Sequence, residues 1–202
     1  MVRLDSAISK QVKALEKMVA FQDRVVAHSN DITNDFKASQ NFTGIDDLQR
    51  RLSLLLSVQS LKKYNSTYEE LNATGQLSTI NDRMTRTKII TFYQLIEDAD
   101  LSIQSNLERV YYSQVFPVLL EVINLEVTTF FDTDQPLVRD YHTKENKEFI
   151  QARLEDVGLQ VRLLNALSLV MMTNIANQYS LERAIINGNE LIAIIRQQQT
   201  DK

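Results

Sequence analysis

The sequence contains no cysteine and no tryptophan, and only four glycines and two prolines among its 202 residues. Without cysteine the chain can form no disulfide and offers no thiolate to a metal or to nucleophilic catalysis. Glycine and proline mark tight turns, so their scarcity leaves few places where short strands could reverse direction. The composition therefore favours long helices.

An excess of one charge is also lacking, because 22 basic and 26 acidic side chains leave a formal charge of -4 and both signs are interspersed along the chain. This pattern is typical of an ordinary solvated surface and gives no nucleic-acid footprint. The richest apolar window, 115–127, is interrupted by Glu121, Asn124 and Glu126. We therefore expect no transmembrane helix within this sequence.

The start of the sequence, MVRLDSAISK, lacks the apolar core of a signal peptide and enters an amphipathic pattern at once. We interpret the chain as the soluble part of a longer protein. Its length fits one large domain with a sizeable core.

Apolar residues spaced alternately by three and four predict a first helix of about 35 residues. Its apolar face comprises Leu4, Ile8, Leu15, Met18, Val25, Ile32 and Phe36, with Gln11, Gln22 and Ser29 on the same face. A corner is expected at residues 41–49, where Thr43 or Gly44 could cap a second helix. That helix should run to about Lys63 and resume from Ser66 to Ala73.

A third long helix is expected to begin at Asp82 as its N-cap. Its apolar face comprises Ile89, Phe92, Ile96, Ala99, Ile103 and Val110. Pro117 should kink this helix, because proline removes a backbone donor. Beyond it the apolar face shifts by about one residue, to Phe116, Leu120, Ile123, Val127 and Phe130.

A break is expected at residues 131–146, with Pro136 opening a turn and Thr143 capping the next helix. The apolar face of the last helical region is read as Leu154, Val157, Val161, Leu164, Met171 and Ile175. Near Tyr179 and Ser180 the pattern shifts phase, to Leu181, Ile185, Ile192 and Ile195, which predicts a bend or a new cap there.

These patterns predict an all-α protein, an elongated antiparallel up-and-down helical bundle of about four long helices with a kink near Pro117. Residues 1–202 are read as a single helical bundle domain.

Few residues suggest chemistry. His28 and His142 lie on different elements and lack the partners of a helical metal site. Glu97, Asp98 and Asp100 could form a carboxylate pair, but their phase against Ile96 and Ala99 points them mainly to solvent. The aromatic residues Tyr111, Tyr112, Phe116, Phe130 and Phe131 could line a pocket, although core packing is the commoner role.

The sequence has no glycine-rich phosphate loop and no nucleophile elbow. We therefore assign no catalytic, cofactor-binding or metal-binding residue and expect no cofactor.

The passage TYEELNATGQLSTIND, 67–82, reads as a corner in which Gly75 takes the left-handed conformation after a short helix. Leu77 and Ile80 would plug the end of the bundle before Asp82 starts the next helix. The longer passage from Tyr64 to Asp100 resembles an uncharacterised bacterial family, a domain of unknown function. The residues that carry this resemblance are Asn65, Thr67, Tyr68, Leu71, Gly75, Leu77 and Ile80, with Thr74 where the family more often has serine.

The resemblance implies an N-terminal transmembrane helix before the domain and a periplasmic location at the inner membrane. The expected function is non-enzymatic, either protein interaction or envelope sensing. The partner would be an unknown protein or a second copy, with no nucleic acid and with membrane contact only through a transmembrane helix absent from this chain. The alternative is a small-molecule-binding four-helix sensor with a pocket near Pro117, and the remote alternative is an enzyme.

Overall fold

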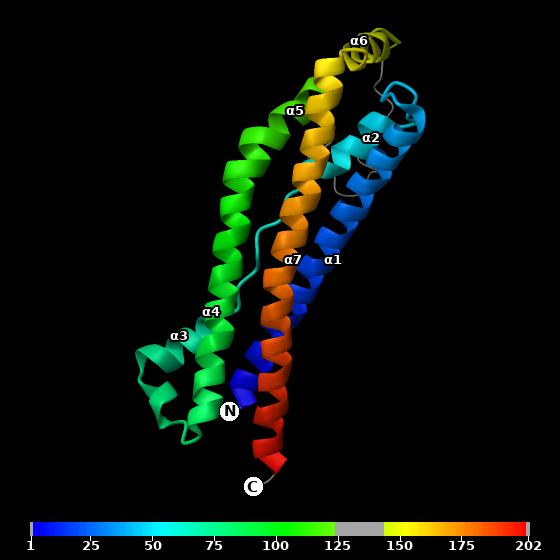
Figure 1. The fold of residues 1–202 in the computed structure, drawn as a ribbon. Coiled ribbons are helices and arrows are strands. Elements are labelled where there is room, and N and C mark those ends of the chain that lie inside the picture. Colours follow the sequence, from blue (N-terminus) through cyan, green and yellow to red (C-terminus); the bar gives the residue numbers. More distant parts are fainter. Residues whose placement is uncertain (1, 124–143, 201–202) are drawn as a thin grey trace. The chain divides into compact units, whose positions relative to one another are not determined.

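The computed structural model describes residues 2–123 and 144–200, and these residues form helices and connecting segments without a strand (Figure 1). The all-α class predicted from the sequence is confirmed. The α-helices are α1 (Val2–Ser39), α2 (Leu48–Ser53), α3 (Ser66–Ala73), α4 (Arg83–Asn106), α5 (Phe116–Val122), α6 (Lys144–Leu154) and α7 (Val157–Thr200). The short 3-10 turns are η1 (Leu54–Leu56) and η2 (Gln76–Thr79), and η3 (Leu107–Val115) is a π-helical segment.

The chain divides into two compact units, each built from segments far apart in the sequence. Unit 1 takes Met1–Asp23, Gln59–Ser105 and Asn174–Lys202, and unit 2 takes Arg24–Val58 and Asn106–Thr173.

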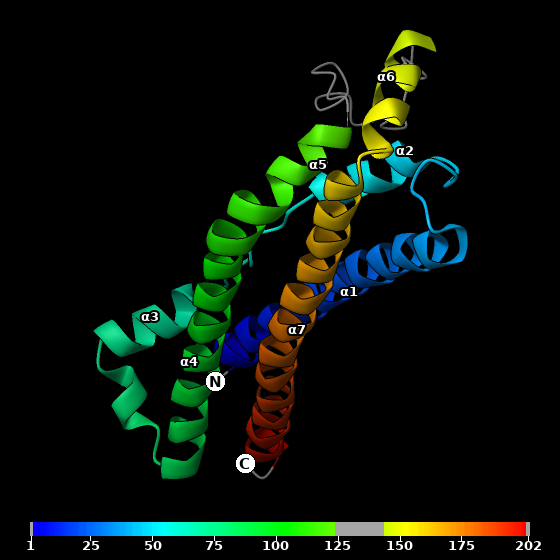
Figure 2. The same ribbon diagram turned by 45° about the horizontal axis from the view of Figure 1, so that its top comes forward.

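In unit 1, α7 runs antiparallel to α1, because Arg196 meets Asp5 near the start of α1 whereas Gln178 bonds Asp23 further along it. The predicted apolar face of α4 is confirmed, since Ile89, Phe92, Ile96, Ala99 and Ile103 are all buried. Both views place α3 beside α4 (Figure 2).

Gly188 allows a close approach within unit 1. A Cβ atom at this position would lie 2.5 Å from Val12 Cγ2 and 2.6 Å from Phe92 Cε2. These distances are well inside van der Waals contact, so only glycine lets α7 come this near to both side chains.

In the described part of unit 2, the buried aliphatic and aromatic residues form one continuous cluster. Phe42 is fully buried, with its ring centroid 4.4 Å from that of Phe36. Within this core α2 lies against α5, and α5 lies against α6.

The second helix is much shorter than predicted. Residues 57–65 have no regular secondary structure, and the helix returns at Ser66–Ala73, as predicted. The predicted cap is also wrong, because Asp47 occupies the N-cap of α2 in the left-handed region (φ 52°), not Thr43 or Gly44. The reason for the shorter helix is tertiary, since side chains of other elements bond the backbone of the unwound segment.

The shift in apolar phase near Pro117 coincides with the π-helical segment, which ends two residues before that proline. Phe116 N–H donates to Tyr111 O, five residues back, as in a π-helix. A π turn inserts one residue into the helical repeat, and the face buried beyond it comprises Val115, Leu119 and Val122. The predicted face is wrong at Leu120, which is 39% exposed, whereas Ile123 is buried as predicted. The predicted positions Val127, Phe130, Phe131, Pro136 and Thr143 lie outside the described residues.

The last helical region differs from the prediction in two ways. It is broken at Glu155 and Asp156, and α7 then continues without interruption through Tyr179 and Ser180. The apolar face predicted up to Ile175 is largely the wrong one, because Val157, Val161 and Ile175 are 73%, 50% and 54% exposed. The face predicted beyond Ser180 is largely confirmed, since Leu181, Ile192 and Ile195 are buried. The buried face comprises Leu159, Leu163, Ala166, Val170, Asn177, Leu181, Ala184, Leu191 and Ile195.

Candidate functional site

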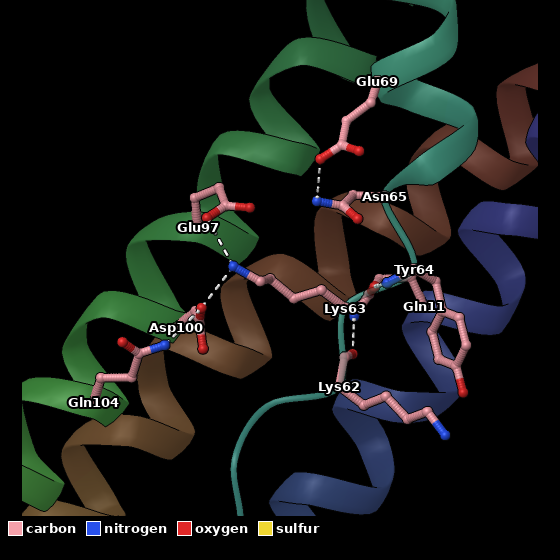
Figure 3. Close-up of polar contacts among 9 residues, drawn as sticks. All are labelled: Gln11, Lys62, Lys63, Tyr64, Asn65, Glu69, Glu97, Asp100 and Gln104. Atoms are coloured by element: carbon pink, nitrogen blue, oxygen red, sulfur yellow. Dashed lines mark hydrogen bonds and ion pairs between the residues drawn. The ribbon is translucent and has the colours of Figure 1, made fainter.

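A polar network in unit 1 holds residues 59–65, which we call the strap, against α1 and α4 (Figure 3). Gln11 of α1 is fully buried. Its Nε2 donates to Lys62 O at 3.1 Å, and its Oε1 accepts the Tyr64 N–H at 2.5 Å. One amide thus satisfies two backbone groups of an unwound segment, as a neighbouring strand would.

Lys63 anchors the same strap to α4 through two carboxylates. Its Nζ lies 2.7 Å from Asp100 Oδ2 and 3.1 Å from Glu97 Oε2. Gln104 Nε2 donates to Asp100 Oδ2 at 3.1 Å. The hydrogen bond to Asp100, reinforced by that to Glu97, raises the pKa of Lys63 above its ordinary value.

The prediction that the acids near residue 100 face solvent is wrong for Asp100, which is only 4% exposed. The sequence carried a signal for this, since Asp100 lies four residues after Ile96 and therefore beside the buried face. The network does not suit amine catalysis, because a nucleophilic lysine needs a lowered pKa and that of Lys63 is raised. Its geometry is that of a structural clamp.

The passage 67–82 forms the corner that the sequence predicted. Gly75 has φ +70° and follows Thr74, the C-cap of α3, so the left-handed conformation is confirmed. Leu77 is buried. Asp82 caps α4 by accepting the N–H groups of Met84 at 3.0 Å and Thr85 at 3.2 Å.

The side chains around Asp82 complete this cap. Bonds from the Thr85 hydroxyl and the Met84 amide lower the pKa of Asp82. Gln198 of α7 donates to Asp82 and to Thr85. The acid is therefore held ionised as a cap, which is a structural role.

Tyr93 and Tyr68 form a stacked pair in unit 1, with ring centroids 4.2 Å apart. Burial raises the pKa of Tyr93 to about 12. Its hydroxyl is buried and has no hydrogen-bond partner among the described residues. A phenol with this pKa stays protonated near neutral pH and is a poor general base.

The aromatic cluster suggested by the sequence is only partly assembled among the described residues. Tyr111, Tyr112 and Phe116 contact one another, with ring centroids 5.2–6.0 Å apart. The Tyr111 hydroxyl donates to Leu55 O at 3.0 Å, and burial raises the pKa of Tyr111. Among the described residues, these rings pack against one another and against the backbone of Leu55.

A separate cavity of about 320 Å³ opens in unit 2 between α5, α6 and the start of α7. Its charged residues are Glu121, Arg153, Asp156 and Arg162, and its other lining residues are Phe149, Ala152 and Leu159. Glu121 Oε2 receives Arg153 Nη2 at 3.1 Å and Arg162 Nη2 at 2.9 Å. This site was not predicted, because its residues come from three elements and the break at Glu155 and Asp156, between α6 and α7, was not expected.

Within residues 2–123 and 144–200, no group of three His, Asp or Glu side chains could hold a metal ion. His28 Nε2 lies 2.7 Å from Arg51 O, in a backbone contact. His142 lies outside the described residues.

α7 carries a second, exposed apolar face opposite its buried one. In unit 1 this face contains Ile175, Tyr179 and Ile186, which are 54%, 65% and 60% exposed. By length and composition alone, the segment Val157–Gln198 could cross a membrane, with a mean hydropathy of 1.3 in its most apolar window. Only 28% of that window is buried, so much of its apolar surface remains available for contact.

Comparison with protein families, with curated proteins and with solved structures finds no match to this chain.

Proposed function

We propose that this chain is a non-enzymatic helical domain that acts through protein interaction, and that its partner is a second copy of itself. The carrying observation is the exposed apolar face of α7 in unit 1, formed by Ile175, Tyr179 and Ile186. Large apolar side chains that line up on one helix face mark an interaction surface more often than scattered ones do.

The spacing of this face fits a helix pair. Residues 175, 179, 182 and 186 follow one another at intervals of four, three and four, as in a coiled-coil seam. Glu182 is the polar member of the seam. A parallel pair would set Glu182 against Glu182 of the second copy, which costs free energy.

An antiparallel pair avoids this repulsion. With the two-fold axis between residues 179 and 182, Ile175 faces Ile186 of the second copy and Tyr179 faces Glu182. The tyrosine hydroxyl can then donate to the carboxylate, while the aliphatic side chains bury each other. The arrangement of one polar and three apolar positions therefore favours an antiparallel homodimer.

Sedimentation over a concentration series tests this proposal. The face is small, so we expect a monomer–dimer equilibrium with Kd of about 10–500 μM. Ile175→Glu should abolish dimerisation, because it places a carboxylate opposite an isoleucine. The double variant Ile175→Glu with Ile186→Lys should restore it, since the introduced glutamate then faces the introduced lysine in the antiparallel register.

Leu101→Glu is the matched control, because Leu101 of α4 is also exposed (63%) but lies off the seam. Its dimerisation should equal that of the wild type. A monomer at every concentration would overturn the proposal. So would a double variant that remains monomeric, or vesicle flotation of the wild type that Ile175→Glu abolishes, since the face would then bind lipid.

We further propose that the chain is a member of the resembled family, anchored in the inner membrane by an N-terminal transmembrane helix with this domain in the periplasm. Gly75 and Leu77, two of the residues that carry the resemblance, support this, because they form the corner that the resembled passage predicts. We also propose that the domain is an elongated antiparallel four-helix bundle with a kink near Pro117, an architecture suited to envelope sensing.

The proposed location can be tested by fusing reporter enzymes to the encoded full-length protein. A reporter at the end of the domain that is active in the cytoplasm would contradict the periplasmic location.

A further inference from the structure

The cavity of unit 2 is separate from the exposed face of α7. Two guanidinium groups, two carboxylates and an apolar wall surround it. Phe149 is 65% exposed although it is a large aromatic residue, and Leu159 lies at 2% exposure beside it. A volume of about 320 Å³ is at the lower end of ligand cavities, so the occupant must be small.

The hydrogen-bonding capacity of the basic side chains is only partly used. Arg153 and Arg162 both reach the same atom, Glu121 Oε2, and each does so through Nη2 alone. A guanidinium group carries five N–H donors. Donors on both arginines therefore remain for a carboxylate, which guanidinium groups bind in a planar, bidentate manner.

Each acidic side chain of the cavity also has one oxygen atom engaged and one that remains available to accept a hydrogen bond. Asp156 Oδ1 accepts the Leu159 N–H at 2.7 Å, which caps α7. Among the described residues no contact reaches Asp156 Oδ2 or Glu121 Oε1. Two acceptor atoms of negative charge therefore remain for a cationic donor such as an ammonium group.

The combined charge of the lining is zero, with two cations and two anions. A plain anion would gain from the arginines but would be repelled by Glu121 and Asp156, and a plain amine would meet the reverse problem. A zwitterion matches both pairs at once. Phe149, with Arg153 stacked 6.0 Å from its ring, and Leu159 then supply contacts for an apolar group.

We propose that this cavity binds a free α-amino acid with a large apolar side chain. Its carboxylate would lie between Arg153 and Arg162, its ammonium group beside Asp156 and Glu121, and its side chain against Phe149. Such a site recognises the backbone of the amino acid by charge and selects the side chain by apolar contact.

Isothermal titration calorimetry with L-phenylalanine tests the proposal on the full chain. We expect saturable binding with one ligand per chain. Binding should weaken at least tenfold for 3-phenylpropionate, which lacks the ammonium group, and for phenethylamine, which lacks the carboxylate. Glycine, which lacks the apolar group, should also bind at least tenfold more weakly.

Three variants locate the binding site. Arg162→Gln and Phe149→Ala should each weaken binding at least tenfold, and both change exposed side chains, so the fold should persist. Asp156→Asn removes the charge but keeps a capping oxygen, and it should weaken L-phenylalanine more than 3-phenylpropionate. Arg50→Gln is the matched control, because Arg50 is an exposed arginine of the same unit that does not line the cavity.

The outcomes separate clearly. Absence of saturable binding overturns the proposal. So does binding of 3-phenylpropionate or phenethylamine that is as tight as that of L-phenylalanine. Wild-type affinity in Arg162→Gln and Phe149→Ala would place the ligand elsewhere and overturn it as well. The melting temperature of every variant is measured as well, so that a loss of binding can be distinguished from a loss of folding.

Discussion

The interior of unit 1 contains several buried polar and charged side chains, whereas the described interior of unit 2 contains only two small hydroxyl side chains. Gln11, Gln22, Thr85, Asp100 and Asn177 are all buried in unit 1. Among the described residues of unit 2, the buried polar ones are Ser29 and Thr33. Their hydroxyls donate to carbonyl groups of α1 itself, Ser29 to Val25 O and Thr33 to Ser29 O.

The difference follows from what each interior has to hold. Unit 1 contains an unwound strap whose backbone groups need partners, and Gln11 pairs two of them while Asp100 holds the side chain of Lys63. The described core of unit 2 packs mainly helix against helix, whose backbone groups are already paired, so apolar side chains suffice. Its charged residues instead surround an open cavity. We therefore expect unit 1 to be specified by hydrogen bonds and unit 2 by packing.

The largest effect on stability should come from creating a cavity in the core of unit 2. Phe42→Ala removes a fully buried ring that packs against Phe36, and it should lower the free energy of unfolding by about 3–5 kcal/mol. Urea denaturation measures this. Phe149→Ala, at an exposed position, should cost less than about 0.5 kcal/mol. Equal costs would mean that unit 2 is not specified by its buried packing.

The next effect should come from breaking the polar interior of unit 1. Gln11→Leu leaves Lys62 O and Tyr64 N–H without their partner, which should cost roughly 1–3 kcal/mol. Hydrogen exchange of the Tyr64 amide should accelerate at the same time. Ser29→Ala in unit 2 removes only a bond within its own helix and should change stability by a few tenths of a kcal/mol. An unchanged Tyr64 amide would show that Gln11 does not hold the strap.

A smaller effect should come from crowding unit 1. Gly188→Ala places a methyl group 2.5 Å from Val12 Cγ2, and overpacking of this kind costs about 1–3 kcal/mol. The better helix propensity of alanine offsets up to about 1 kcal/mol. We expect a net loss of stability in thermal melting. Gly44→Ala, where the nearest atom is 3.9 Å away, is the control and should be nearly neutral.

Much of the fold could be predicted where one apolar face dominates a helix. The buried face of α4 and the corner at Gly75 and Asp82 followed from spacing and cap chemistry. The buried face of α7 could not be predicted in the same way. This helix carries apolar residues on two faces, and their spacing does not indicate which face meets the core. Val161 and Ile175 were placed on the buried face and Leu163 was not, although Val161 and Ile175 are exposed and Leu163 is fully buried.

The polar features were harder to predict, because their partners are distant in the sequence. Gln11 bonds residues 51 and 53 positions away, and Lys63 meets Asp100 across 37 positions. No local pattern encodes such pairs. The cavity could not be predicted for the same reason, since Glu121 and Arg162 become neighbours only through the packing of α5, α6 and α7.

The smallest effect on stability should come from deprotonating Lys63, which forms ion pairs with Asp100 and Glu97. Because Asp100 and Glu97 raise the pKa of Lys63, the stabilisation is fully present below the unfolded pKa near 10.5 and is lost as pH rises through the higher folded value. The raised pKa values of Tyr93 and Tyr111 also reduce stability at alkaline pH.

A variant separates these contributions. Lys63→Gln keeps both tyrosines, so the difference in unfolding free energy between wild type and variant isolates the lysine. This difference should shrink between about pH 10 and 12, from a starting value of at most about 1 kcal/mol, because Lys63 is partly exposed. A difference that stays constant over this range would mean that the ion pair does not stabilise unit 1, and that Gln11 alone holds the strap.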